Sequence, residues 1–288
     1  MKDQAENLRL KLQTQTKDQY NARTIAVVSG KGGVGKSNFS LNFSLSLLKL
    51  NHKVLLIDMD IGMGNLDILM GKAPEYSIVD YLSNHVPLQN IIMEGHEGIH
   101  YIAGGTGLSQ LVKFDEELIE QFTSELHLLF KQYEYVVFDM GAGISDDTLR
   151  ILLSVHEIIV VTTPEPTSIT DAYATMKFIH LQDPTLRMYL VVNKILSDKE
   201  GKETYRRIST VLDKFLDREI VSLGFLPEDR SIQQAVKRQI PFLLFNPKSP
   251  ASLALKSITD RYKKQKFDDE TPSSLPFVLK LKKFLFER

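Results

Sequence analysis

A glycine-rich octapeptide that directly follows a β-branched run constrains this chain more than any other feature. Residues 24–29 (TIAVVS) run into residues 30–37 (GKGGVGKS), which match the pattern G-x-x-x-x-G-K-[ST]. In loops of this pattern the backbone N–H groups cradle phosphates, the lysine reaches the β- and γ-phosphates, and the hydroxyl ligates Mg²⁺. Because the loop stands between a strand and a helix, it predicts a phosphate site at their junction.

A second motif overlaps the first. Gly30, Gly32 and Gly35 also fit the pattern G-x-G-x-x-G of dinucleotide-binding folds. Asp58 lies 23 residues after Gly35, at the end of the next predicted strand, where such a fold places its ribose-binding acid. A dinucleotide site is therefore a genuine alternative.

Three features favour a nucleoside triphosphate. A Lys-Ser pair at 36–37 follows the last glycine directly, and it supplies the cation and the hydroxyl that Mg-nucleotide binding uses. A further carboxylate, Asp60, follows the first predicted acid, and ribose binding does not require it. A later strand, 135–140, ends in Asp139, with Gly141 after it, the usual form of a magnesium-holding acid beside a glycine that faces the γ-phosphate.

Short β-branched runs alternate with helix-length segments over most of the chain. The predicted strands are residues 24–29, 53–58, 99–103, 135–140, 157–163, 188–193 and 219–226. The clearer predicted helices are residues 115–132, 168–181, 202–217 and 249–264. Near-continuous apolar strands separated by helices are typical of a parallel sheet covered on both faces. We predict an α/β fold, a three-layer sandwich with a mainly parallel sheet, of the P-loop NTPase type.

The segment after the loop is ambiguous by periodicity alone. Apolar residues alternate strictly from Phe39 to Leu47, as in a strand, whereas the stripe at positions 39, 43, 47 and 50 fits a helix equally well. Because the phosphate loop requires a helix after it, we predict a helix here.

The chain divides into four predicted segments. Residues 1–22 form a short helix and a polar linker, residues 23–264 the main domain, residues 265–274 a flexible tether, and residues 275–288 an amphipathic helix. The N-terminus is too polar for a signal peptide, and no apolar run approaches the ~18–20 residues of a membrane span. We therefore expect a cytoplasmic protein.

Two features of the composition exclude function classes. The 288 residues include no cysteine, which excludes disulfides, a thiol nucleophile, and any thiolate-held zinc or iron–sulfur cluster. The net charge is −1, so the molecule is no polycation built for nucleic acid, and no nucleic-acid partner is expected. Residues 251–288 hold nine Lys/Arg and five Asp/Glu, a net of +4, which leaves −5 for the rest.

An extra cation, Lys31, lies inside the loop. Backbone N–H groups suffice to cradle phosphate, so Lys31 is either a solvated surface charge or has a role of its own. With it, the loop resembles the deviant Walker A loop of the SIMIBI class, in which this lysine reaches across a dimer to the partner's nucleotide. The missing cysteines exclude the cluster-carrying and arsenite-sensing members of that class.

Further stretches narrow the resemblance. Those typical of the MinD branch are residues 58–67 (DMDIGMGNLD), Asn193-Lys194 and residues 227–231 (PEDRS). Gly141 stands where MinD proper tends to carry proline, and residues 3–9 (DQAENLR) match the DQAxxLR element of the flagellar members. From about residue 24 to 262, the chain is identified as a member of the MinD/ParA-type ATPases of the FlhG family, also called FleN or YlxH.

The resemblance and the chemistry of phosphoryl transfer together imply the site residues. The expected ATP-binding residues are Gly30, Lys31, Gly32, Gly33, Val34, Gly35, Lys36, Ser37, Asn38, Gly141, Glu165, Asn193, Pro227, Glu228 and Asp229. The expected catalytic residues are Asp60, Lys31 and Lys36, and the expected Mg²⁺ ligands are Ser37, Asp58 and Asp139.

Four of these residues have specific expected roles. Asp60 would orient the attacking water, because phosphoryl transfer needs positioning more than a strong base; a solvated turn after the strand is the alternative. Lys31 would supply transition-state charge in trans, as an arginine finger does elsewhere. By resemblance, Asn193 reads adenine and Glu165 approaches the partner's ribose, unless Glu165 is simply a surface acid on a loop.

The C-terminal segment has the pattern of a basic interfacial helix. Its apolar face holds Phe277, Val278, Leu281, Phe284 and Leu285, and basic residues lie opposite. The alternative is a terminal helix packed on the protein's own core, and both can hold in turn if the helix is stored in one nucleotide state. Two tails on an ATP-bound dimer would bind lipid far more tightly than one. We expect the ATP-bound protein to be peripheral on the inner face of the cell membrane.

The N-terminal segment and the remaining partners rest on the resemblance. It implies that Asp3, Gln4, Ala5, Leu8 and Arg9 belong to a helix that stimulates GTP hydrolysis by FlhF, a signal-recognition-type GTPase; a frayed terminus is the alternative. It also implies an ATP-dependent homodimer and suggests flagellar C-ring proteins as partners.

The predicted function is a Mg²⁺-dependent ATP hydrolase that dimerises, cycles on the membrane, and regulates the number or placement of flagella. One alternative is a ParA-like DNA-partitioning ATPase, which predicts salt-dependent DNA binding. The acidic body and the amphipathic tail argue against it. A small-molecule synthetase on the same loop is the other alternative, and the sequence gives no sign of an organic substrate pocket.

Overall fold

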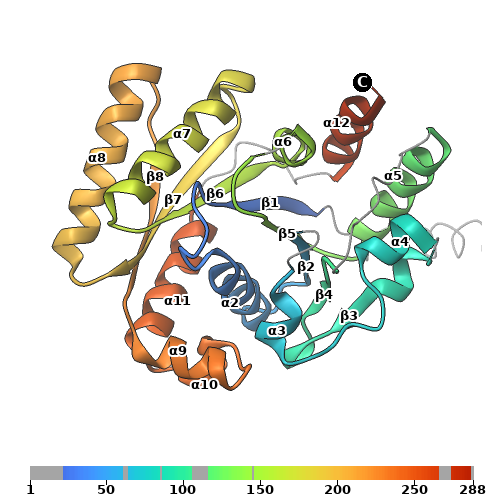
Figure 1. Ribbon diagram of the computed structural model, residues 1–288, viewed down its shortest axis with the longest axis horizontal. Helices are drawn as coiled ribbons and strands as arrows, with labels where there is room; N and C mark the ends of the chain where they lie inside the picture. Colours follow the sequence, from blue (N-terminus) through green and yellow to red (C-terminus); the bar gives the residue numbers. More distant parts are fainter. Residues whose placement is uncertain are drawn as a thin grey trace, which may run out of the picture.

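The computed structural model describes residues 22–60, 64–84, 86–105, 116–144, 146–265 and 274–286. Their centre is an eight-stranded sheet in the order β3-β4-β2-β5-β1-β6-β7-β8 (Figure 1). The strands are β1 (Arg23–Val28), β2 (Val54–Met59), β3 (Ile92–Glu94), β4 (His100–Ile102), β5 (Tyr135–Met140), β6 (Glu157–Thr162), β7 (Arg187–Ile195) and β8 (Val221–Pro227). Neighbouring strands pair in parallel except the short β3, which pairs antiparallel with β4.

Helices cover both faces of the sheet. One face carries α2 (Lys36–Lys49), α3 (Leu66–Met70), α9 (Arg230–Lys237), α10 (Phe242–Phe245) and α11 (Pro250–Lys263). The other carries α4 (Ile78–Asn84), α5 (Glu116–Phe130), α6 (Asp146–Ser154), α7 (Pro166–Gln182), α8 (Asp198–Leu216) and α12 (Ser274–Phe286). Two single-turn helices, η1 (Leu88–Ile91) and η2 (His96–Gly98), flank β3. The predicted three-layer α/β sandwich is confirmed.

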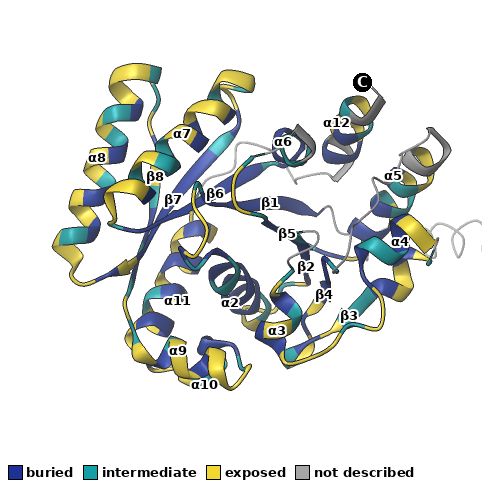
Figure 2. Cartoon of the chain, viewed as in Figure 1, coloured by how far each residue is buried: buried dark blue, intermediate teal, exposed yellow. Residues whose placement is uncertain are grey.

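The two cores are separated by the alternation of side chains along each strand. On β1, Ala26 and Val28 face one core, whereas Ile25 and Val27 face the other. All four are at most 3% exposed, which explains why the strand reads as one continuous apolar run. Figure 2 shows the same burial across the sheet.

Helix α2 is the predicted helix whose periodicity was ambiguous. It lies between the sheet and α11, and Phe43 meets the Tyr262 ring of α11 edge-on at 5.4 Å between centroids. Every residue from Phe39 to Leu47 is buried. A helix buried on all sides needs no polar face, so its apolar residues carry little helical periodicity.

Several short elements are absent from the predicted set: β3, α3, α4, α6, α9 and α10. α10 has only four residues, and it is held by two of them, Phe242 and Leu243, which are buried in the core. Elements this short are stabilised by tertiary packing rather than by local propensity, so their sequence pattern is weak.

α12 packs on the body of the protein. The Phe277 ring stacks on Phe138 of β5 at 5.3 Å and tilts against Phe130 of α5 at 5.5 Å between centroids. Phe277, Val278 and Leu281 are 1, 7 and 4% exposed, and Phe284 is half-buried. The structure therefore shows the alternative arrangement, a terminal helix on the protein's own core, for most of the predicted membrane face.

Three predictions fall partly or wholly outside the described residues. They concern the N-terminal helix with Asp3, Gln4, Ala5, Leu8 and Arg9, most of the tether, and the side chain of Leu285. Over the ranges that the structure describes, no helix is both long and apolar enough to span a bilayer.

Candidate nucleotide-binding site

The phosphate loop joins β1 to α2 at the carboxyl end of the sheet, where the chain leaves β1 between β5 and β6. Gly33 and Gly35 have φ of +77° and +91°, in the left-handed region that favours glycine. At Gly35 a Cβ would also lie 2.4 Å from Nδ2 of Asn193, and at Gly30 it would lie 2.3 Å from the backbone of Asp171 on α7. The turn requires glycine at positions 33 and 35, and close packing requires it at positions 30 and 35.

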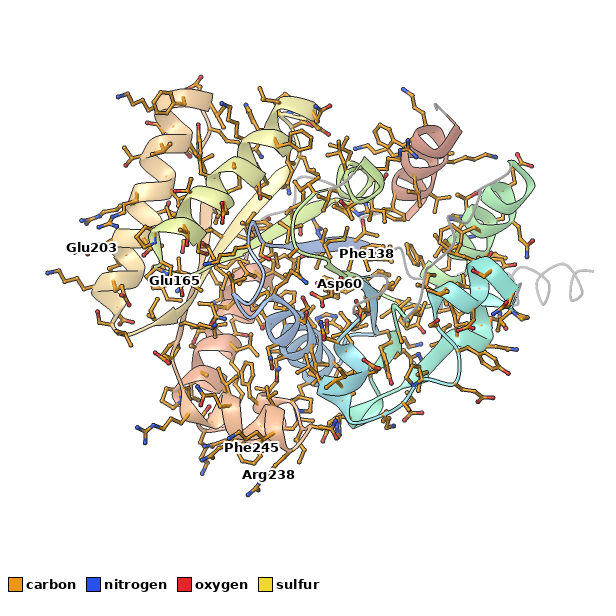
Figure 3. All side chains as sticks on the ribbon, in the orientation of Figure 1. Asp60, Phe138, Glu165, Glu203, Arg238 and Phe245 are labelled. Atoms are coloured by element: carbon orange, nitrogen blue, oxygen red, sulfur yellow. The ribbon has the colours of Figure 1, made fainter. Side chains whose placement is uncertain are left out.

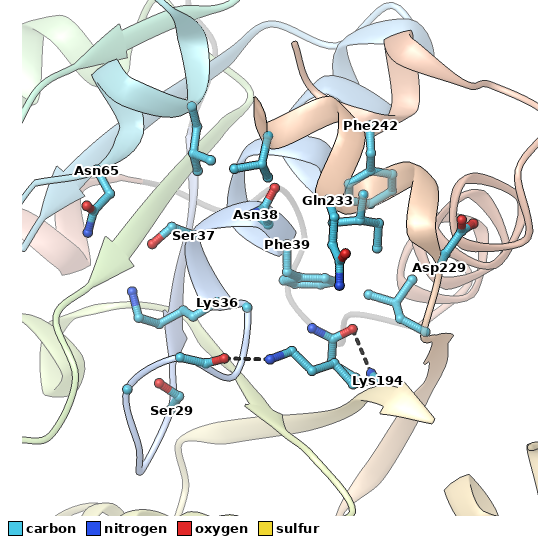
Figure 4. Close-up of a pocket in the computed structure, with 18 of the residues that line it drawn as sticks. Ser29, Lys36, Ser37, Asn38, Phe39, Asn65, Lys194, Asp229, Gln233 and Phe242 are labelled. Atoms are coloured by element: carbon cyan, nitrogen blue, oxygen red, sulfur yellow. Dashed lines mark hydrogen bonds between the residues drawn. The ribbon is translucent and has the colours of Figure 1, made fainter. Parts of the chain in front are cut away.

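A pocket of about 760 Å³ opens beside this loop (Figure 4). Many of the site residues predicted from the sequence line it: Gly32, Gly33, Gly35, Lys36, Ser37, Asn38, Asp60, Asn193, Pro227, Glu228 and Asp229. Four elements distant in sequence thus converge: the loop with α2, the segment after β2, and the ends of β7 and β8. A cavity of this size suits a small organic ligand. One end of it is lined by the loop and Lys36, which can donate hydrogen bonds to phosphate.

Lys36 is held by a carboxylate under the loop. Its Nζ lies 2.9 Å from Oδ1 of Asp139, and the Ser40 hydroxyl donates to the same oxygen at 2.8 Å. Lys36 is 7% exposed and Asp139 1%, so this is a buried ion pair. Binding a triphosphate requires the ammonium to exchange Asp139 for phosphate oxygens, which leaves the acid available to a cation.

Asp58 organises the segment that follows β2. Its carboxylate accepts the backbone N–H groups of Asp60 at 2.9 Å, Asn65 at 3.1 Å and Leu66 at 3.3 Å. Burial, and then the nearby charge of Asp139, raise the pKa of Asp58 to about 6. The two acids are register partners on β2 and β5, so two carboxylates lie close together beneath the loop.

These carboxylates fit the predicted magnesium site. The repulsion between Asp58 and Asp139 is the kind that a bound cation relieves, and Ser37 supplies a hydroxyl at the start of α2. Across the described ranges no three His, Cys, Asp or Glu side chains cluster as a stand-alone metal site. Mg²⁺ needs none, because one or two carboxylates together with phosphates and waters complete its octahedron.

Asp60 and Gly141 lie close together. Asp60 is half-buried and lines the pocket, and a Cβ on Gly141 would lie 3.4 Å from its Oδ1. Figure 3 shows Asp60 near the centre of the molecule. The position is suited to holding a water against the terminal phosphate, the role predicted for this acid.

Lys31 and Glu165 lie outside the pocket and pair with each other. Lys31 Nζ is 3.2 Å from Oε2 of Glu165 and donates to Oγ1 of Thr167 at the same distance. The two charged side chains are 43 and 62% exposed, so both are accessible to a second subunit. Glu165 is the N-cap residue of α7 (Figure 3).

The structure uses Asn193 in a way the sequence did not predict. Its Nδ2 donates to the Val34 carbonyl at 2.8 Å, and the neighbouring Lys194 donates to the Gly33 carbonyl at 2.8 Å. Asp229 is likewise committed, since its carboxylate accepts the N–H groups of Ser231 and Ala251, bonds that lower its pKa. The adenine-reading role of Asn193 stays a prediction.

Another wall of the pocket is apolar, and the sequence did not predict it. Its residues are Phe39, Ile68, Leu69, Leu226, Ile232, Val236 and Phe242 (Figure 4). They come mainly from α3, α9 and α10, the short helices that were not predicted. Such a wall suits the flat face of a base, whereas the loop side suits phosphates.

Comparison with known proteins agrees with the site. Residues 21–263 match the ParA family, described as NUBPL iron-transfer P-loop NTPase. The chain has no cysteine with which to hold an iron–sulfur cluster, so iron transfer does not carry over.

Two curated relatives are flagellar proteins. The chain is 32% identical over 246 residues to the antiactivator FleN of Pseudomonas aeruginosa. This alignment covers 84% of this chain and 86% of FleN. It is 36% identical over 222 residues to the flagellum site-determining protein YlxH of Helicobacter pylori. This alignment covers 76% of this chain and 74% of YlxH.

The fold also matches a solved structure. A chain of the MinC:MinD cell division protein complex of Aquifex aeolicus superposes with a TM-score of 0.70 at 25% identity, over 86% of this chain and 99% of that one. With a family match across the whole sheet and two flagellar relatives above 30% identity, this chain belongs to the ParA family of P-loop NTPases and, within its MinD-like ATPases, to the FlhG branch that includes FleN and YlxH.

Proposed function

We propose that this chain is a Mg²⁺-dependent ATP hydrolase that dimerises with ATP, releases α12 to the membrane, and thereby regulates the number or placement of flagella. Its relatives FleN and YlxH are named as an antiactivator and a flagellum site-determining protein. The observation that carries the proposal is the burial of the basic, apolar helix α12 on the same body that holds the nucleotide site.

Nucleotide binding begins with the loop. Its N–H groups and Lys36 hold the phosphates, and the apolar wall with Pro227 and Glu228 encloses the base. Ser37, Asp58 and Asp139 would hold Mg²⁺, which neutralises charge on the phosphates when bound. Asp60 orients the attacking water, and its half-buried position beside Gly141 supports that role.

Dimerisation follows from the second lysine. Lys31 is stored on Glu165 and Thr167 of its own subunit, and an exposed ion pair of this kind is worth only about 0–1 kcal/mol. A phosphate group on a facing subunit is a stronger partner for the ammonium. Exchange of Lys31 and Glu165 onto the partner's nucleotide therefore costs little and completes the site in trans.

The stored helix supplies the membrane response. The side chains of Phe277, Val278 and Leu281 are buried when α12 lies on β5 and α5, and they would also be buried in a lipid interface. The docked and the membrane-bound state of α12 therefore differ little in free energy. Lys280 and Lys282 pair with Asp183 and Glu120 at 4.0 and 3.0 Å, and anionic lipid would replace both acids. Small changes in the body can then shift α12 to the membrane.

Liposome flotation of wild type and Asp60→Ala, each with ATP and with ADP, tests this proposal. We expect ATP to drive dimerisation and flotation, with a gain of ~10²-fold over ADP from paired helices, and Asp60→Ala to trap that state. Lys36→Ala should lose nucleotide binding, and Lys31→Ala should keep it but lose dimer-dependent hydrolysis. Equal flotation with ATP and ADP contradicts the switch.

The remaining partners are part of the proposal and rest on family resemblance. Residues 1–20 would stimulate an FlhF-type GTPase, and C-ring proteins would recruit the dimer to the flagellar base. Removing residues 1–20 should abolish stimulation of FlhF GTPase and leave this chain's ATPase intact. Unchanged stimulation would refute the assignment.

A further inference from the structure

We propose that Lys194, together with Asn193, is a positioning residue that holds the phosphate loop in its ligand-binding conformation before any nucleotide arrives. The inference rests on the proposed nucleotide-binding function. The two side chains donate to successive carbonyls of the loop: Lys194 Nζ to Gly33 and Asn193 Nδ2 to Val34, each at 2.8 Å. Figure 4 shows Lys194 reaching the loop from the end of β7.

The direction of these bonds determines where the loop's donors point. In a trans peptide the C=O of one residue and the N–H of the next are antiparallel. With the Gly33 and Val34 carbonyls drawn toward β7, the N–H groups of Val34 and Gly35 are turned the other way, toward the concave side of the loop. Among the described residues, neither of these N–H groups donates to another group of the chain.

The strand is distorted so that both neighbours reach the loop. Successive side chains of a regular strand point to opposite faces, so adjacent residues do not ordinarily bind one target. Here the pairing of β7 with β8 shifts register between Val192 and Ile195. Lys194 has φ of +58°, unusual for a non-glycine residue, and its N–H donates to Oδ1 of Asn193 at 2.9 Å. Strain of this kind is retained where it serves a site.

The benefit is preorganisation. Glycine at positions 30, 32, 33 and 35 gives the loop more backbone freedom than any other residue type would. Without contacts that order the loop beforehand, a ligand must order it on binding, which weakens the affinity. Lys194 is exposed, whereas Asn193 is only 7% exposed. Of the two contacts with the loop, that of Lys194 is therefore adjustable and that of Asn193 is fixed. Neither bond involves a base, which separates this role from adenine recognition.

Binding of inorganic tripolyphosphate and of ATP, both measured by competition against a fluorescent ATP analogue, tests the role. Lys194→Met should weaken both ligands by the same factor, about tenfold, because a lost hydrogen bond from a charged donor has that magnitude. Lys194→Arg should restore most of the affinity. Lys202→Met is the matched control: it removes an exposed lysine of α8 that does not line the pocket, and both ligands should bind within about twofold of wild type.

A second measurement separates loop positioning from a direct contact of Lys194 with phosphate. In the protein without nucleotide, Lys194→Met should lower the ¹⁵N order parameters of the Val34 and Gly35 amides, while those of β1 stay unchanged. Thermal unfolding should match wild type, since the side chain is exposed.

Three results would overturn the inference: weaker ATP binding with unchanged tripolyphosphate binding, unchanged binding of both, or unchanged order parameters in the loop. Failure of the wild-type protein to bind either ligand would instead refute the nucleotide-binding function itself. The two failures are therefore distinguishable.

Discussion

Two helices near the C-terminus cover opposite faces of the same sheet in different ways. α11 follows α10 after a short turn, is capped by Ser249, and buries Leu255, Ile258 and Tyr262 to 1% exposure or less. α12 follows a segment predicted to be a tether, and among its described side chains those of Phe277, Val278 and Leu281 are buried. α11 is therefore part of the fold, whereas we expect α12 to exchange between two environments.

Polar contacts repeat the contrast. The Tyr262 hydroxyl of α11 donates at 2.6 Å to Glu157, which is wholly buried and also pairs with Arg23 at 2.7 Å. Burial of the Tyr262 hydroxyl, and then the charge of Glu157, raise the pKa of Tyr262 well above its ordinary value. The ion pair of α12, Lys282 with Glu120, is 40 and 63% exposed. Screening makes such a pair weak.

The largest expected effect is on folding itself. A chain that ends at residue 249 should not fold, because removal of α11 exposes one side of α2 and leaves the Glu157 carboxylate without the Tyr262 donor. A chain that ends at residue 265 should fold, bind ATP and fail to float with liposomes. Circular dichroism and nucleotide binding distinguish the two. A 1–265 chain that does not fold would show that α12 is as integral as α11.

Point substitutions give a smaller effect. Leu255→Ala in α11 should lower the free energy of unfolding by ~2–5 kcal/mol, as expected for a fully buried leucine. Leu281→Ala in α12 should lower it by no more than ~2 kcal/mol, since the loss cannot exceed the free energy of docking when α12 detaches first. Urea denaturation measures both. Equal losses would contradict the distinction.

Polar contacts should differ least. Tyr262→Phe removes one donor from a buried carboxylate and should cost about 1–3 kcal/mol. Lys282→Ala breaks the exposed pair and should cost about 0.5 kcal/mol or less at low salt, vanishing at high salt. Thermal unfolding at two ionic strengths compares them. A salt-dependent cost for Tyr262→Phe would be inconsistent with its burial.

The central strands of the parallel sheet were predictable because they are buried on both faces and their apolar runs are continuous; β1 and β6, buried along their whole length, are examples. The phosphate loop was predictable because its chemistry fixes both residue types and spacing. α9 and α10 were not, since helices of eight and four residues depend on packing. The sequence pattern of α12 favoured lipid over the protein's own core, but it could not decide between them, because the same apolar face suits either.

Within the site, the sequence predicted which residues converge but not what each contacts. Asp58, Asp139, Ser37 and Asp60 come together because strand ends share one edge of the sheet. The contacts of Lys194 depend on a register shift between β7 and β8. Such a shift follows from cross-strand packing, and no local residue pattern signals it.

Locking α12 in place tests the central claim, that nucleotide state controls its release. The chain has no cysteine of its own, so Glu120→Cys/Lys282→Cys can be joined selectively by a short, reducible bismaleimide across a contact that measures 3.0 Å between the native side-chain ends. Gln121→Cys/Glu125→Cys, joined within α5 alone, is the matched control.

ATP-dependent liposome flotation is the readout. We predict that the locked protein still binds ATP but does not float, that reduction of the linker restores flotation, and that the control floats throughout. Flotation of the locked protein to the same extent as the control would contradict the account.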